Sequence, residues 1–148
     1  MTPPLVNGVS HIALAVPQLE AALTRMEQLL GIAPTPIQEN AGQHVRLAYF
    51  DLGNTRIEVL QPTDTGSPLG RFLERNPRGG IHHLSLSVAD LDVALDHAAI
   101  AGAPQVGTVG RSVHGERLAF LDPRETLGAL FELEEAGPTA IPAAGSPR

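Results

Sequence analysis

The sequence predicts an α+β fold built from two tandem βαβββ modules with approximate two-fold symmetry, whose strands form a curved mixed sheet around a cavity. Three observations support this prediction. The chain resembles itself at an offset of 72 residues, each copy combines strand patterns with one helix pattern, and each copy has a histidine near its start and a glutamate near its end.

The repeat is clearest between residues 8–23 and residues 80–95, where seven of sixteen positions are identical. It places His11 opposite His83. Beyond this segment the similarity is weaker, but each copy keeps a glutamate at an almost equal distance from its histidine. We therefore expect two equivalent modules, the first at residues 8–62 and the second at residues 80–135.

Each copy begins with a sequence pattern typical of a strand, followed by one typical of a helix. Large aliphatic residues alternate with small or polar ones over residues 11–16 and 83–88, which is the period of a half-buried strand. Apolar residues at helical spacing then end at Gly31 in the first copy. In the second copy they begin after Asp90, a good N-cap residue, and end before Gly102.

Four further runs complete the modules, and a short segment joins them. Aliphatic or aromatic residues bounded by turn residues predict strands at 45–52, 56–60, 117–121 and 129–133. Ser67-Pro68 predicts a capped helix within the linker, residues 63–79. One module alone would bury little surface, so we expect a single domain over residues 8–135, an N-terminal tail over 1–7, and a disordered tail over 136–148.

The composition excludes several kinds of chemistry. The 148 residues include no cysteine and no lysine, which removes thiolate nucleophiles, cysteine–zinc sites and Schiff-base lysines. A net charge of −6 with scattered arginines argues against a nucleic-acid partner. No apolar run reaches the ~20 residues of a membrane span, and no signal peptide is evident, so we expect a cytoplasmic protein without membrane contact.

Strand parity places the repeated histidines and glutamates on one side of the sheet. Small residues share the face of each histidine, whereas the glutamates alternate with large apolar neighbours. We therefore predict that two histidines and two glutamates converge as a metal site. The predicted ligands are His11, Glu58, His83 and Glu132. Taken singly, a strand histidine is more often structural and Glu58 could be a solvated edge residue, so the prediction depends on the repetition.

Imidazole and carboxylate ligands without thiolate suit a borderline divalent ion. We expect one ion per chain, Co²⁺ in the first place, with Zn²⁺, Mn²⁺, Ni²⁺ or Fe²⁺ as alternatives. His114 and Gly115 lie in a glycine-containing loop before the strand at 117–121. That loop is either a plain connection or a closure over the cavity, and in the second case these two residues contact the substrate.

At this point the residues resemble a known group. Paired βαβββ modules with histidine and glutamate at these strands are similar to the vicinal oxygen chelate superfamily, which includes glyoxalases, bleomycin resistance proteins and dioxygenases. Within it the methylmalonyl-CoA epimerase family is the most similar. The segments that carry the likeness are HIALAV from His11, LGNTRIEVLQP (52–62), SPLGRFLERNPRGGIHHLSLSV (67–88) and HGERLAFLDPRETLGALFELEE (114–135).

The resemblance implies the function. It implies interconversion of (2S)- and (2R)-methylmalonyl-CoA by proton transfer at the carbon α to the thioester, through a metal-stabilised enolate. It also implies that Glu132 is both ligand and base, that the partner is an acyl-CoA, and that the chain forms a homodimer. The family's second acid/base, a glutamate on the third strand, is absent from residues 45–49, which leaves Glu39, His44 or a water as candidates.

Two other functions are open to the same fold. A glyoxalase-type lactoylglutathione lyase would use the same ligands, but the segment at 124–127 is longer than such an enzyme shows at this place. A non-catalytic, resistance-type binding protein often stacks aromatic rings on its ligand, and this chain has only four phenylalanines and one tyrosine. The intact ligand set favours the enzyme.

Overall fold

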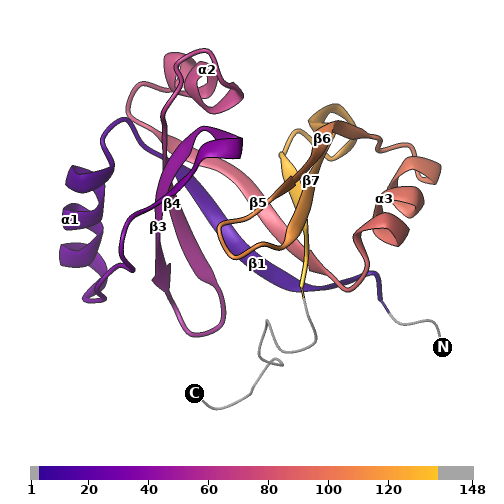
Figure 1. The fold of residues 1–148 in the computed structure, drawn as a ribbon, viewed down its shortest axis with the longest axis horizontal. Coiled ribbons are helices and arrows are strands. Elements are labelled where there is room, and N and C mark those ends of the chain that lie inside the picture. Colours follow the sequence, from indigo (N-terminus) through magenta and orange to yellow (C-terminus); the bar gives the residue numbers. More distant parts are fainter. Residues whose placement is uncertain (1–3, 137–148) are drawn as a thin grey trace. The chain divides into compact units, whose positions relative to one another are not determined.

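The computed structural model describes residues 4–136, which form three α-helices, eight strands and two short 3-10 helices, η1 (Ala41–Gln43) and η2 (Pro123–Glu125) (Figure 1). The first module consists of β1 (Val6–Ala15), α1 (Leu19–Leu30), β2 (Gln38–Asn40), β3 (Val45–Asp51) and β4 (Arg56–Pro62). The second consists of β5 (Gly80–Val88), α3 (Leu91–Ile100), β6 (Gln105–Arg111), β7 (Arg117–Leu121) and β8 (Phe131–Glu135). Along the chain, α2 (Pro68–Arg75) follows the first module and precedes the second. The predicted α+β class and the repeated βαβββ order are confirmed.

The compact units of the structure do not coincide with these modules. One unit, here called the terminal unit, combines the described residues up to His11 with those from His83 onward. The other consists of residues 12–82. Both boundaries fall inside strands, β1 and β5, so each of these two strands contributes residues to both units.

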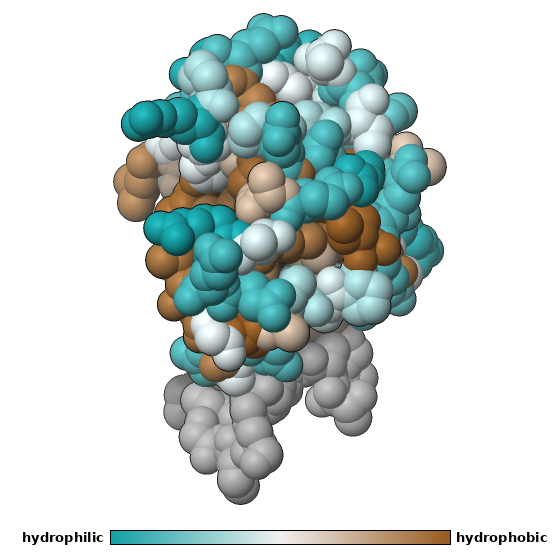
Figure 2. All heavy atoms as spheres, turned by 90° about the vertical axis from the view of Figure 1, so that its left-hand side faces the viewer, coloured by the Kyte–Doolittle hydropathy of each residue, from teal (hydrophilic) through white to brown (hydrophobic). Residues whose placement is uncertain are grey.

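In the 12–82 unit, α1 packs on a sheet in which β2, β3 and β4 pair antiparallel and β1 follows β4. The helix ends at Gly31, whose φ of 67° lies in the left-handed region that favours glycine and whose N–H bonds the carbonyl of Glu27. The buried side chains of this core are Leu19, Leu23, Ala48, Phe50 and Val59. Figure 2 views the molecule from the side of α1, where hydrophilic side chains alternate with smaller hydrophobic areas.

Helix α2 begins as the Ser67-Pro68 pair predicts. The Ser67 hydroxyl accepts a hydrogen bond from the N–H of Gly70 at 3.1 Å, and Pro68 occupies the first turn. Gly70 is buried against the backbone of Thr65. Farther along the helix, Phe72 meets the ring of His82 edge to face, with centroids 5.1 Å apart.

In the terminal unit, β5 pairs parallel with β8, and β8, β7 and β6 pair antiparallel in that order. Asp90 caps α3 by accepting from the N–H of Val93 at 3.1 Å. The helix packs on this sheet over a core of aliphatic side chains. Its buried members are Val88, Leu91, Ala94, Ala119, Leu121 and Leu133.

The strand predictions differ from the structure in identifiable ways. None of the predicted strand ranges corresponds to β2 or β6, because neither strand has an alternating apolar pattern. β2 is three polar residues, and β6 contains Gly107 and Gly110. β1 begins at Val6, inside the predicted N-terminal tail, and the predicted tail at 136–148 lies outside the described residues except for Ala136. Within residues 4–136, no helix combines the length and apolar character needed to cross a bilayer.

We predict that Gly70→Ala destabilises the protein by about 1–3 kcal/mol, although alanine is the better helix former. A Cβ at this position would overlap the Thr65 carbonyl oxygen and lie 2.6 Å from its carbonyl carbon. Urea unfolding measures the effect. Gly42→Ala is the matched control, since its Cβ would have only an ordinary contact, 3.6 Å from the Asn40 Oδ1. Equal stability of the two variants would contradict the prediction.

A second prediction concerns acid stability. Burial lowers the pKa of His82 from its ordinary value of 6.5 to about 4. Between these values the unfolded chain binds a proton that the native chain does not, so stability is complete above pH 6.5 and declines as the pH falls toward 4. The loss is on the order of 2–3 kcal/mol. His82→Phe should flatten this part of the pH profile in urea unfolding, whereas His97→Phe, at an exposed position, should not.

Candidate metal centre

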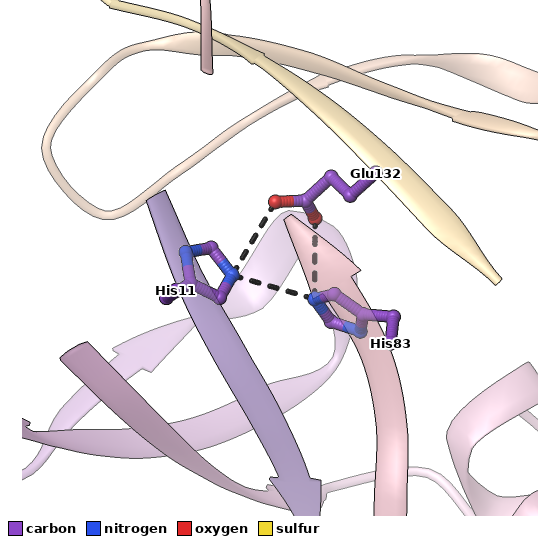
Figure 3. A group of neighbouring side chains, drawn as sticks. All are labelled: His11, His83 and Glu132. Carbon is purple, nitrogen blue, oxygen red and sulfur yellow. Dashed lines mark hydrogen bonds and ion pairs between the residues drawn. The ribbon is translucent and has the colours of Figure 1, made fainter. Parts of the chain in front are cut away.

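Three side chains of the terminal unit bring their ligand atoms together (Figure 3). His11 extends from β1, His83 from β5 and Glu132 from β8. The two Nε2 atoms are 3.4 Å apart, His11 Nε2 is 3.4 Å from Glu132 Oε1, and His83 Nε2 is 3.5 Å from Glu132 Oε2. All three residues are buried, with exposed fractions of 2%, 5% and 3%. The structure thus brings together three of the four predicted ligands.

The spacing and chemistry of these atoms fit a divalent ion. Donors at ~2.1 Å from a common ion lie ~3.0–3.4 Å from one another at angles of 90–109°. Two imidazole nitrogens and a carboxylate all offer electron pairs, and electron pairs repel unless a cation or a proton lies among them. The cluster could therefore bind a metal ion, and its donor types do not select one borderline metal over another.

The strands fix Glu132 and His83 through close neighbours. Ser85 pairs with Glu132 across the parallel β5–β8 ladder, and its hydroxyl donates to Glu132 Oε1 at 2.8 Å. The ring of Phe120, on strand β7 beyond β8, meets the His83 ring edge to face, with centroids 5.2 Å apart. One of the small residues that parity placed beside the histidines, Ser85, is thus a buried hydrogen-bonding group as well as a spacer.

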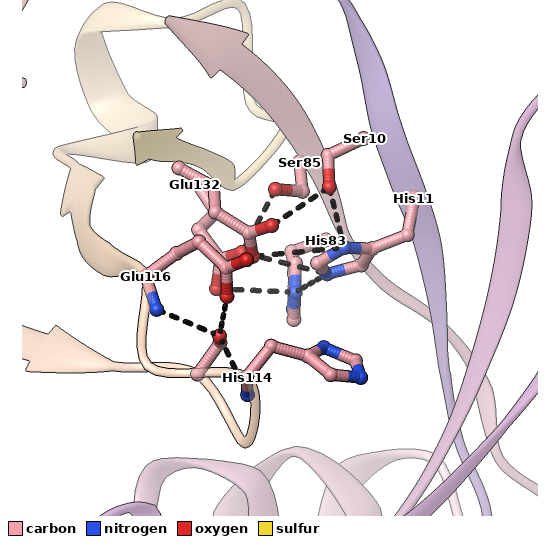
Figure 4. Close-up of polar contacts among 9 residues, drawn as sticks. Ser10, His11, His83, Ser85, His114, Glu116 and Glu132 are labelled. Carbon is pink, nitrogen blue, oxygen red and sulfur yellow. Dashed lines mark hydrogen bonds and ion pairs between the residues drawn. The ribbon is translucent and has the colours of Figure 1, made fainter. Parts of the chain in front are cut away.

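Sequence reasoning missed two polar residues beside His11, and Figure 4 shows one of them, Ser10, with its contact to the His11 ring. The Ser10 hydroxyl lies 3.2 Å from His11 Nδ1 and donates to Glu134 Oε1 at 3.0 Å. Glu134 Oε2 is 3.9 Å from the same Nδ1, and Glu134 is only 6% exposed. One signal was available, because Glu134 lies two residues after Glu132 and so shares its strand face. Nothing in the sequence marked Ser10.

Glu58, the fourth predicted ligand, lies on β4 in the 12–82 unit. It pairs with Tyr49 of β3 across the antiparallel ladder. Its exposed fraction is 7%, so it is not the solvated edge residue that the alternative interpretation required. Its role as a ligand stays a prediction.

The predicted substrate residues, His114 and Gly115, form the tip of the β6–β7 hairpin. Both are exposed, and Gly115 has a φ of 92°. Ser112 organises the turn: its hydroxyl donates to Glu116 Oε2 at 2.5 Å and accepts from the N–H of His114 at 3.1 Å. The loop borders an open hollow of about 370 Å³, which Arg117 also lines. Contact of His114 and Gly115 with substrate stays a prediction.

The charge of Arg117 at this hollow is already compensated. Its guanidinium donates to Asp92 at 2.7 Å and lies 3.5 Å from a Glu135 oxygen. The hydrogen bond from Arg117 lowers the pKa of Asp92, which therefore carries its negative charge at neutral pH. At the hollow, the positive charge of Arg117 is thus neutralised by the neighbouring carboxylates.

Comparison with known proteins gives consistent similarities. The model of the Glyoxalase/Bleomycin resistance protein/Dioxygenase superfamily matches residues 10–120. An ethylmalonyl-CoA/methylmalonyl-CoA epimerase of Cereibacter sphaeroides is 38% identical over 133 residues, 88% of this chain and 99% of the relative. The crystal structure of Mycobacterium tuberculosis methylmalonyl-CoA epimerase has a TM-score of 0.84 at 28% identity, covering 93% of both chains. A Streptomyces coelicolor methylmalonyl-CoA epimerase variant in complex with 2-nitronate-propionyl-CoA has a TM-score of 0.83 at 25% identity, covering 89% of this chain and 99% of that one.

We predict that His83→Ala weakens Co²⁺ binding at least about 100-fold, because it removes one of three converging ligand atoms. Titration of metal-free protein with Co²⁺, followed by absorption or calorimetry, measures this affinity. His97→Ala is the matched control, since His97 is exposed on α3 and contributes no atom to the cluster. Equal affinity in the two variants would exclude this cluster as the metal site.

Proposed function

The chain belongs to the Glyoxalase/Bleomycin resistance protein/Dioxygenase superfamily, and from this premise we propose that it is a metal-dependent methylmalonyl-CoA epimerase. The proposed reaction inverts the carbon next to the thioester carbonyl, converting (2S)- and (2R)-methylmalonyl-CoA into one another. The acyl-CoA substrate is supported by a relative named for ethylmalonyl-CoA and methylmalonyl-CoA and by a similar enzyme in complex with an acyl-CoA analogue.

The observation that carries the proposal is the convergence of His11, His83 and Glu132 in a buried cluster. We propose these residues, together with Glu58, as the ligands of one divalent ion, with Co²⁺ as the first choice. When bound there, the ion supplies Lewis-acid stabilisation for the negative charge that a thioester develops when it loses its α-proton. The choice of Co²⁺ rests on the resemblance and on the nitrogen and oxygen donors.

Glu132 is the proposed base. Its carboxylate is buried and faces two imidazole nitrogens, and Ser85 fixes the orientation of the carboxylate by donating to Oε1. A positioned carboxylate can take the α-proton from one face of the substrate carbon, and a second acid must return a proton to the opposite face. Glu39, His44 and a water are the candidates for that acid. Both side chains belong to the 12–82 unit and are exposed.

A lactoylglutathione lyase would use the same kind of cluster, so the choice of substrate rests on similarity to the named epimerases. A non-catalytic binding protein has no need for three buried ligand atoms within 3.5 Å of one another. Both observations support the epimerase over its alternatives. A homodimer and a cytoplasmic location complete the proposal, and both rest on the expectations from sequence.

The proposed reaction has a direct test. We expect metal-loaded protein in D₂O to incorporate deuterium at C2 of (2S)-methylmalonyl-CoA and to produce the (2R) epimer, with both followed by mass spectrometry and chiral assay. Glu132→Gln should lose at least about 1,000-fold in kcat, because the variant lacks the proton acceptor. His97→Ala should exchange at the wild-type rate.

Each contrary result has a distinct meaning. Metal-loaded protein that leaves methylmalonyl-CoA unexchanged but consumes the hemithioacetal of glutathione would replace the epimerase with the lyase. Deuterium exchange at the full rate in metal-free protein would contradict the metal dependence of the reaction but would leave the proposed substrate in place. Wild-type turnover by Glu132→Gln would exclude Glu132 as the base.

A further inference from the structure

We propose that Ser10 and Glu134 are positioning residues that fix the tautomer of His11, so that its Nε2 presents an electron pair to the cluster. The inference deepens the proposed function and rests on it, because a defined electron pair matters most if the cluster binds metal. Neither residue belongs to the ligand set. Both lie in the terminal unit, on β1 and β8, with exposed fractions of 8% and 6%.

The direction of the hydrogen bonds follows from the donor inventory. A carboxylate only accepts, so the 3.0 Å contact to Glu134 Oε1 uses the single hydrogen of the Ser10 hydroxyl. The same hydroxyl oxygen lies 3.2 Å from His11 Nδ1 and can only accept there. Nδ1 must then carry the proton, and in a neutral imidazole the other nitrogen, Nε2, carries the electron pair.

The second ring nitrogen faces the other two members of the cluster, where an electron pair is favourable when a proton or a cation lies among the donors. His11 Nε2 lies 3.4 Å from both His83 Nε2 and Glu132 Oε1. In metal sites a ligating histidine commonly donates its other N–H to an oxygen acceptor, which fixes the ring and raises its basicity. Ser10 and Glu134 place such an acceptor behind His11, because the hydrogen bond to Glu134 turns the serine hydroxyl oxygen toward Nδ1 as an acceptor.

Burial favours the tautomer of His11 that is protonated at Nδ1 over the one that is protonated at Nε2. The other tautomer would direct the Nδ1 electron pair at a hydroxyl oxygen that has already donated its hydrogen, and in a buried site that repulsion is not relieved by water. The repeat places His82 opposite Ser10, so His83 has no serine at the equivalent position. The Ser10–Glu134 hydrogen bond therefore orients His11 and has no equivalent at His83.

The first test is spectroscopic and needs no metal and no substrate. The ¹⁵N NMR spectrum of metal-free protein with ¹⁵N-labelled histidine, recorded at about pH 8, shows which nitrogen of each neutral ring is protonated. The signal that disappears in His11→Gln belongs to His11. We expect the Nδ1–H form to dominate in wild type. Ser10→Ala should lower its share. Glu134→Gln should lower it too, because an amide can donate to Ser10 and release the hydroxyl hydrogen toward Nδ1.

Ser87→Ala is the matched control for the loss of a buried serine hydroxyl. Ser87 lies on β5, is 1% exposed, and its hydroxyl has no hydrogen-bond partner within the described residues. It should keep the wild-type tautomer. An unchanged His11 tautomer in both Ser10→Ala and Glu134→Gln would overturn the inference, as would a wild-type ring that is protonated at Nε2.

The second readout is Co²⁺ affinity, where Ser10→Ala should bind about 10- to 100-fold more weakly and Ser87→Ala as wild type. Equal affinity of Ser10→Ala and wild type would overturn the positioning role. Failure of the wild-type protein to bind any divalent ion is a different result. It would remove the metal from the proposed function, while the tautomer of the metal-free protein would still decide whether Ser10 and Glu134 orient His11.

Discussion

The burial of three electron-pair donors within 3.5 Å of one another is the constraint on which the terminal unit depends. Two imidazoles and a carboxylate repel at this distance unless protons or a cation lie among them, and burial removes the water that would relieve the repulsion. The fold meets the constraint by surrounding the donors with oriented partners. Ser85 donates to Glu132, Ser10 connects His11 with Glu134, and Phe120 sets the ring plane of His83.

Much of the fold could be predicted because it depends on local patterns. The helices at 19–30 and 91–100 follow from apolar spacing and end residues, and α2 follows from Ser67-Pro68. β2 and β6 could not be predicted in this way, since their stability comes from hydrogen bonds to β3 and β7 rather than from an apolar face. A strand whose side chains are polar or absent has no period to detect.

The cluster was predictable for a different reason. His11 and His83 occur at matching positions of a repeat, and Glu132 follows the second histidine at a distance similar to that in the first copy. The sequence did not predict the residues that hydrogen-bond to the members of the cluster and orient them. Contacts such as Ser10 to Glu134 join residues 124 positions apart, so strand pairing determines them and no spacing along the chain encodes them.

The repeat is therefore symmetric in its predicted ligands and asymmetric in the residues around them. An offset of 72 relates Ser85 to Ala13 and Ser10 to His82, so neither serine has a counterpart that can play the same part. His82 packs on Phe72 and its pKa is lowered by burial, whereas Ser10 links His11 to a buried carboxylate. The proposed epimerisation needs a base on one face of the carbon and an acid on the opposite face, so its two acid/base groups have different roles. Divergence of the supporting residues lets the two modules supply groups that differ. On this argument the serines, more than the ligands themselves, distinguish the two halves of the protein.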